Sequence, residues 1–192
     1  MKISKGKFLI CLGVLLVVID QVIKVLVKTN MSLGESIHVF GDWFQIFFIE
    51  NEGMAFGMKF GGAVGKFLLS LFRIVLFGAL VWWIRDLLKK SDTPFGVVAG
   101  LTLITAGAMG NIIDCWFYGL IWDYAPFMFG KVVDMFYFPI IDTVFPEWMP
   151  LIGGHPFLFF APVFNFADSC VTCGALYLLF FQSLVFFIAC FQ

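Results

Sequence analysis

Two short segments of the chain repeat the pattern Asn-x-x-Asp beside long apolar stretches. Asn111 precedes Asp114 by three residues, and Asn165 precedes Asp168 by three residues. Residues three apart share one face of a helix, so each amide can orient a carboxylate or bind the backbone of a substrate. An ionisable residue in an apolar span is energetically unfavourable and by default marks function or a structural pair. The sequence therefore indicates a site built on carboxylates.

The chemistry that fits such a site is acid–base hydrolysis. Two carboxylates held close together share one proton, so the ionised one can activate water while the protonated one donates to a carbonyl oxygen. This is the arrangement of aspartic proteases. We find no Ser/Lys, Ser/His or Cys/His arrangement and no H-E-x-x-H motif that would support another mechanism. The residues alone leave the pair open among four candidates: Asp20, Asp114, Asp134 and Asp168.

Each polar group in a span also has a structural interpretation. Asp20 and Lys24 lie one helical turn apart and can form an intrahelical ion pair. Arg73 can extend toward lipid headgroups or balance a carboxylate. Asp168 can cap a helix start, where the helix dipole favours an acid.

The cysteines and histidines do not predict a metal site. Of the five cysteines, Cys170 and Cys173 have C-x-x-C spacing but lie in an apolar helical stretch without a second ligand pair. We interpret them as small side chains at a helix interface. His38 and His155 are isolated in the sequence. We therefore expect no metal and no cofactor.

The composition requires a membrane environment. Hydrophobic residues make up 61% of the 192 residues, charged residues only 13%, and the mean hydropathy is +1.00. Soluble domains have roughly 45–50% apolar and about 25% charged residues. The formal net charge of −1 gives no reason to expect a nucleic-acid partner.

Four apolar stretches are long enough to cross a bilayer, which takes about 20 residues per helix. Lysines and arginines precede the first stretch and follow the second, so we expect both termini in the cytoplasm. The expected architecture is one membrane domain over residues 1–192, an all-α bundle of four transmembrane helices with a small β-sheet outside the cytoplasm. The expected spans are 8–27, 66–88, 95–118 and 164–191, and the outer segments are 28–65 and 119–163.

The outer segments carry further signals. Residues 36–51 read as a β-hairpin with its turn at Gly41-Asp42. Residues 119–162, rich in aromatic residues and proline, suggest a rigid loop that lies partly against lipid.

With this orientation the polar residues of the spans all fall in the outer half of the membrane. A transport path would need polar groups through the full thickness, so the pattern disfavours the alternative function, a small proton-coupled carrier or a lipid-binding membrane protein. An assembly subunit whose acids only pair helices is a further alternative. The residues that converge on this level are Asp20, Lys24, Arg73, Asn111, Asp114, Asp134, Asn165 and Asp168.

Five strings in order along the chain resemble the bacterial lipoprotein signal peptidase (signal peptidase II) family. Each string alone is weak, but together on a frame of four spans they cover nearly the whole chain. The strings are "IDQVIK", "ENEGMAFG", "GAMGNIID", "GKVVDMFYF" and "PVFNFADS".

The resemblance implies an aspartyl endopeptidase of the bacterial cell (inner) membrane, with its site near the outer leaflet. Such an enzyme cleaves prolipoproteins N-terminal to the diacylglyceryl-cysteine, contacts membrane lipids and is the target of globomycin. It implies Asp134 and Asp168 as the catalytic pair. The supporting or substrate-binding residues that it implies are Asp20, Lys24, Asn51, Gly53, Ala55, Asn111, Asp114 and Asn165.

The chain departs from the family pattern at one position in particular. The family usually has Arg directly after the Asp of its third motif, and here that residue is Cys115. Arg73 is the candidate to supply the positive charge. The outer segment from Tyr118 to Pro162 also looks longer than in typical members.

Overall fold

The computed structural model describes residues 4–52, 62–90, 92–159 and 162–182. The chain forms two compact units. The first contains residues 1–23, 51–132 and 166–192, and the second contains residues 24–50 and 133–165. Asn51 is described, whereas the expected site residues Gly53 and Ala55 lie outside the described residues.

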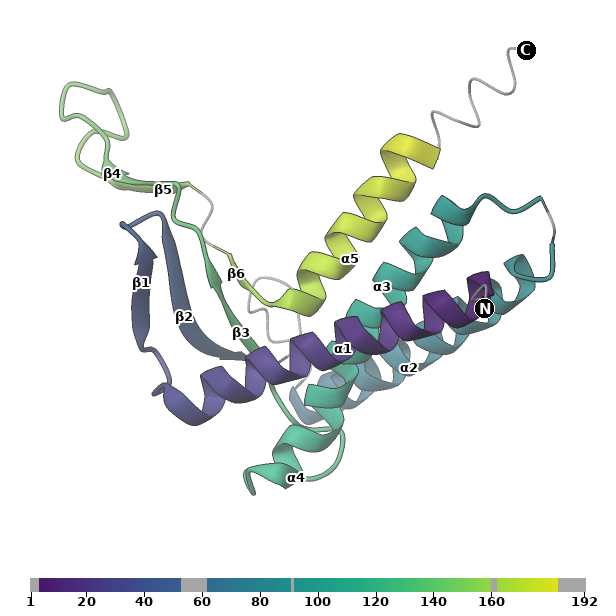
Figure 1. Ribbon diagram of the computed structural model, residues 1–192. Coiled ribbons are helices and arrows are strands. Elements are labelled where there is room, and N and C mark those ends of the chain that lie inside the picture. The colour runs from purple at the N-terminus through teal and green to yellow at the C-terminus, as the bar shows by residue number, and fades with distance from the viewer. Residues whose placement is uncertain (1–3, 53–61, 91, 160–161, 183–192) are drawn as a thin grey trace, which may run out of the picture. The chain divides into compact units, whose positions relative to one another are not determined.

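The first unit consists of long apolar helices (Figure 1). Within it, α3 packs against both α2 and α5. α3 runs without a break into a π-helical turn, residues 114–118, and then into the short helix α4. α5 likewise ends in a π-helical turn, residues 178–182. The helix bounds are α1 Lys5–Asn30, whose residues up to Ile23 belong to this unit, α2 Gly62–Leu87, α3 Phe95–Ile113, α4 Gly119–Ile121 and α5 Phe166–Tyr177.

Small residues allow α3 and α5 to approach closely. A Cβ atom on Gly107 would lie 2.3 Å from the backbone oxygen of Ala167, and one on Gly174 would lie 2.7 Å from the backbone oxygen of Gly100. Helices in lipid associate through such close van der Waals packing, because lipid tails are as apolar as the side chains. The Gly- and Ala-rich sequence of α3 is therefore what brings α5, and Asp168 with it, against α3.

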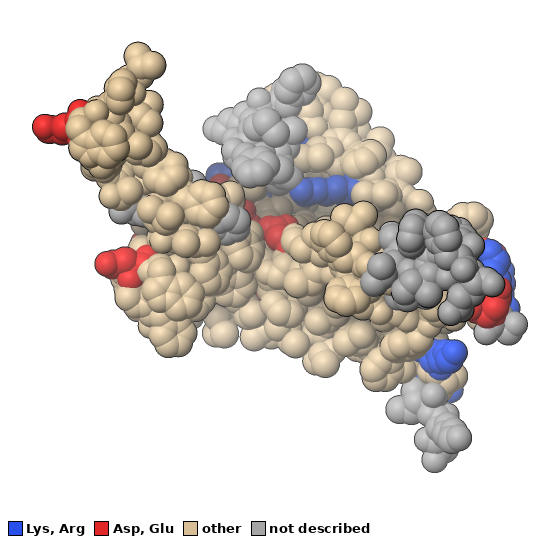
Figure 2. Space-filling view, turned by 90° about the horizontal axis from the view of Figure 1, so that it is seen from above, with Lys and Arg blue, Asp and Glu red and all other residues tan. Residues whose placement is uncertain are grey.

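Three helices of the described chain are long and apolar enough to cross a membrane: Lys5–Asn30, Gly62–Leu87 and Phe95–Ile121. They agree with the first three expected spans. The fourth expected span begins as a shorter apolar helix, Phe166–Phe181, and residues 183–191 of it lie outside the described part. Many large apolar side chains on these helices are exposed, and the face in Figure 2 is mostly uncharged with few groups of acidic or basic residues. Such a surface fits contact with lipid.

The second unit contains most of an antiparallel sheet in the order β1-β2-β3-β6 and a separate hairpin, β4-β5. The predicted hairpin in residues 36–51 is confirmed as β1 and β2, and its turn contains Gly41 at a φ of 51°. The segment 119–163, expected as a loop, instead contains several strands, because its short aromatic runs pair with each other and with the hairpin. The strands are β1 Ser36–Phe40, β2 Phe44–Asn51, β3 Val132–Tyr137, β4 Ile141–Val144, β5 Pro156–Phe159 and β6 Val163–Phe164.

Candidate active site

Asp168 lies in the first turn of α5, half-buried, and is held by a side chain of α3. Nδ2 of Asn111 donates a hydrogen bond to Oδ1 of Asp168 over 2.8 Å. The N-terminal turn of a helix carries partial positive charge, so an acidic side chain is well placed there. Asn111 and the helix start together define the orientation of this carboxylate.

Asp20 fixes the same turn of α5 from α1. It is 1% exposed, and its Oδ1 accepts a hydrogen bond from the backbone N–H of Ala167 over 2.8 Å. The first N–H groups of a helix have no partner within the helix, so this bond satisfies one that would otherwise be unpaired. Because Ala167 directly precedes Asp168, Asp20 acts as a positioning residue for the turn that carries Asp168.

Gln21, which the sequence alone did not indicate as a site residue, joins Asp20 and Asp114 in a hydrogen-bond network. Its Nε2 donates to Oδ2 of Asp20 over 3.1 Å and to Oδ1 of Asp114 over 2.9 Å, and its Oε1 accepts from the Tyr118 hydroxyl over 3.1 Å. Asp114 is fully buried. In the sequence, Gln21 could have been found as a second polar residue directly after Asp20 inside an apolar span. The network ties α1 to the end of α3.

Gly110 completes the contact between α1 and α3. A Cβ atom at this position would lie 2.5 Å from Oδ2 of Asp20 and 3.0 Å from Cβ of Ala167. Any larger residue would displace the carboxylate that caps α5, so the glycine is required by space.

Asp134 belongs to the second unit and lies in the middle of β3, with 2% of its surface exposed. β3 pairs with β6 in the register Phe136↔Phe164, and Asn165 follows β6 directly. Nδ2 of Asn165, itself fully buried, donates to Oδ1 of Asp134 over 2.7 Å. The strand pairing is therefore what brings this amide to this carboxylate.

The asparagine partners differ from the simplest reading of the repeated motif. Each Asn-x-x-Asp segment suggested an amide beside its own carboxylate. Instead the Asn111 amide bonds Asp168, and the Asn165 amide bonds Asp134. Both bonds join an amide N–H donor to a carboxyl oxygen.

A cavity of about 340 Å³ lies beside Asp168 in the first unit. Its polar lining includes Arg73, Asn111 and Asp168, and its walls include Leu69, Phe72, Leu76 and Val171. Nη1 of Arg73 donates to Sγ of the buried Cys115 over 2.9 Å. An apolar cavity with a few convergent polar groups is the usual form of a binding site.

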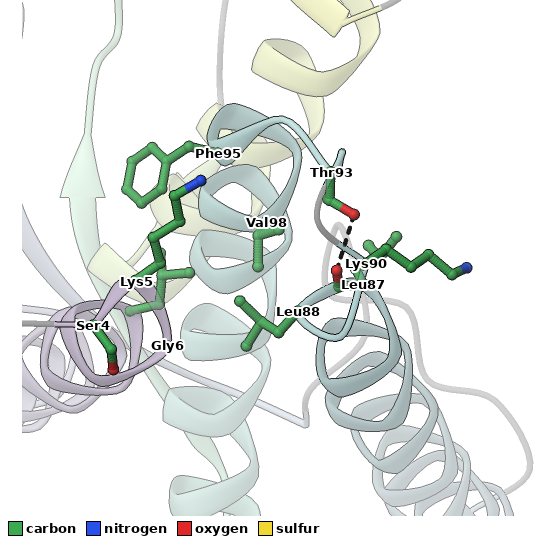
Figure 3. A pocket seen from close by; sticks show the side chains of 10 residues that line it. Ser4, Lys5, Gly6, Leu87, Leu88, Lys90, Thr93, Phe95 and Val98 are labelled. Atoms are coloured by element: carbon green, nitrogen blue, oxygen red, sulfur yellow. Dashed lines mark hydrogen bonds between the residues drawn. The ribbon is translucent and has the colours of Figure 1, made fainter.

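A second cavity of about 330 Å³ lies where α1 begins and α2 ends (Figure 3). Lys5 and Lys90 line it, and none of the described lining residues is acidic. The Lys90 ammonium pairs with Asp86 at 2.9 Å. Thr93 beside it donates from its hydroxyl to the backbone oxygen of Leu87 over 2.9 Å. None of the candidate acids lines this cavity, so it is not a candidate for the hydrolytic site.

The remaining expected site residues are less informative. Lys24 is fully buried in α1, and Asn51 is half-buried at the end of β2. The described cysteines, Cys170 and Cys173 included, are free thiols. Within the described residues, no group of three or more His, Cys, Asp or Glu side chains is arranged to hold a metal ion.

Comparison with known proteins points to one family. The family model described as "Signal peptidase (SPase) II" matches residues 12–185. A lipoprotein signal peptidase from Porphyromonas gingivalis is 48% identical over 193 residues, covering 93% of this chain and 84% of the relative. One from Amoebophilus asiaticus is 37% identical, covering 85% of this chain and 72% of the relative.

Two solved structures of bacterial membrane enzymes are similar to this chain. A bacterial membrane enzyme determined by the in meso method is 26% identical to this chain, with a TM-score of 0.63. The similarity covers 93% of this chain and 87% of the solved one. A second such structure has a TM-score of 0.60 at the same identity.

Proposed function

Because the chain belongs to the signal peptidase II family, we infer that it removes signal peptides from prolipoproteins, cutting N-terminal to the diacylglyceryl-cysteine. The observation that carries this function is the family match over residues 12–185, which contains all the candidate acids. The substrates are membrane-anchored precursors, so the apolar, lipid-compatible surface of the helices suits the reaction.

We propose Asp134 and Asp168 as the catalytic pair. Each carboxylate accepts a hydrogen bond from an asparagine side chain, and each lies in a string that resembles a motif of the family. Asp20 supports the pair by capping the first turn of α5 through Ala167. Asp114 belongs to the network of Gln21, which joins α1 to α3. Lys24, Asn51, Gly53 and Ala55 are proposed supporting or substrate-binding residues on the resemblance alone.

In the proposed reaction one carboxyl group is ionised and the other protonated. The ionised group takes a proton from water as the water oxygen attacks the scissile carbonyl carbon. The protonated group donates its proton to the carbonyl oxygen, giving a tetrahedral intermediate. The C–N bond then breaks, the carbonyl reforms as its hydroxyl returns a proton, and the amine of the diacylglyceryl-cysteine leaves with the proton taken from water.

We further propose four membrane spans within a single membrane domain, with both termini cytoplasmic and the catalytic pair near the outer leaflet. The basic residues at the N-terminal end of α1 and after α2 support this orientation, since short cytoplasmic loops are enriched in Lys and Arg. Globomycin-type inhibitors are proposed ligands of the same site, on the resemblance to the family.

The test is cleavage of a diacylglyceryl-modified prolipoprotein by purified protein, read as a gel shift with and without globomycin. Asp134→Asn and Asp168→Asn should each lower kcat by about 10⁴-fold, as expected when one member of a catalytic unit is removed. Asp86→Asn, at the partly exposed end of α2, is the matched control and should cleave normally. Thermal unfolding in detergent checks that each variant is folded. Normal processing by either site variant would refute the assignment of the pair.

A further inference from the structure

Arg73 places a permanent positive charge in the middle of an apolar helix. It lies in α2, Gly62–Leu87, and is half-buried. Charged residues inside membrane helices are rare and generally mark pairing or function. Nη1 of this guanidinium donates to Sγ of Cys115 over 2.9 Å. A neutral thiol is a weak hydrogen-bond acceptor.

The orientation of Arg73 is fixed by its neighbour one turn earlier. Ser70 is 3% exposed, and its hydroxyl donates to the backbone oxygen of Met128 over 3.1 Å. Residues three apart lie on the same face of a helix. This face of α2 is therefore held against the segment that follows α3, and Arg73 points inward to Cys115 rather than along the helix toward a headgroup layer.

The same guanidinium lines the cavity beside Asp168. Among the described residues of that lining Arg73 is the one cation, and Asn111 and Asp168 stand on α3 and α5. The walls are mostly apolar side chains of α2, α3 and α5. A group that fits such a cavity has an apolar chain and a carbonyl oxygen close to the acid. A prolipoprotein offers this chemistry twice, in the peptide bonds near the cleavage point and in the esters of the diacylglyceryl group.

We propose that Arg73 is a substrate-binding residue, whose guanidinium donates a hydrogen bond to a carbonyl oxygen of the prolipoprotein beside Asp168. The proposal rests on the assignment of Asp168 to the catalytic pair. The guanidinium reaches the side chain at position 115 from α2, so an arginine placed at position 115 would bring its guanidinium to the same region.

The experiment removes the guanidinium from position 73 and then supplies one at position 115, and it measures KM and kcat for each variant. Arg73→Met should raise KM by about 10- to 100-fold, the effect of losing a hydrogen bond from a charged donor. The pH dependence of kcat should stay unchanged. The double variant Arg73→Met/Cys115→Arg should recover most of the lost kcat/KM, and Arg73→Lys should give an intermediate KM because Lys supplies charge without the planar fork. Arg85→Met, in the last turn of the same helix, is the control and should behave as the unmodified enzyme.

Two substrates identify the source of the carbonyl. One carries the natural diester and the other carries ether-linked chains, which lack ester carbonyls. If the effect of Arg73→Met on KM is equal for both, the partner is a peptide carbonyl, and if it disappears for the ether, the partner is an ester.

An unchanged KM in both the Met and Lys variants would overturn the proposal, as would failure of the relocated arginine to restore activity. A shifted pH profile with unchanged KM would assign Arg73 to pairing with a carboxylate instead. The kcat of Asp168→Asn tests the catalytic pair, whereas the KM of the Arg73 variants tests substrate binding. The two proposals can therefore fail separately.

Discussion

Asn111 and Asp168, which are 57 positions apart in the sequence, share a hydrogen bond of 2.8 Å between α3 and α5. The amide nitrogen is the donor in this contact, and a carboxyl oxygen of Asp168 accepts. It holds Oδ1 of Asp168 in one direction, and Asp20 holds the turn of α5 on which Asp168 stands. The orientation of the proposed catalytic carboxylate thus depends on three helices.

Replacing Asn111 should therefore impair turnover more than binding. Asn111→Leu keeps the volume and removes the donor to Asp168, so kcat should fall by about 10- to 100-fold, with KM changed by less than about threefold. Steady-state kinetics on a lipid-modified substrate measures both. Asn30→Leu is the control, because among the described residues the Asn30 amide bonds to its own segment, to Leu26 and Thr29 at the exposed end of α1. An unchanged kcat in Asn111→Leu would show that the contact does not orient the acid.

The close approach of α3 and α5 predicts a contrast between two glycines. Gly107→Ala would put a Cβ atom 2.3 Å from the backbone oxygen of Ala167, so the helices must separate. We expect a loss of about 1–3 kcal/mol of stability, typical of overpacking, and a lower kcat because Asp168 moves with α5. The melting temperature in detergent and the cleavage rate measure these effects.

Gly78→Ala in α2 is the matched control for that substitution. Apart from the adjoining backbone of α2, no described atom lies within 4 Å of the added Cβ, so only helix propensity changes, which favours Ala by up to about 1 kcal/mol. Its melting temperature should stay equal or rise. Equal destabilisation by both substitutions would contradict the packing argument.

The C-x-x-C pair should be dispensable. Cys170 is buried and Cys173 is exposed, and both are free thiols on α5. Cys170→Ala/Cys173→Ala should retain kcat/KM within about threefold, since small apolar substitutions near the volume of Cys are tolerated in a packed interface. Dithiothreitol should not alter the activity of the unmodified enzyme. A large loss of cleavage in a folded double variant would instead assign chemistry to these thiols.

Much of the architecture follows from the sequence alone, because it depends on local composition. Spans are set by runs of apolar residues, and three of them appear in the described helices at the expected places. The hairpin of residues 36–51 follows from alternating residues around Gly41, whose φ of 51° suits the residue. The identity of the candidate acids also came from the sequence, since charged residues in apolar stretches are conspicuous.

The partners of those acids were decided only by the tertiary structure. The bond from Asn111 to Asp168 depends on the packing of α3 against α5, and the bond from Asn165 to Asp134 depends on the register of β3 and β6. The roles of Gln21 and of Arg73 against Cys115 likewise join distant segments. Hydropathy and motif spacing report on neighbours along the chain, whereas a hydrogen bond requires two groups within about 3 Å in a particular direction. Helix packing and strand register decide whether two groups satisfy that condition, and neither can be read from a single stretch of the sequence.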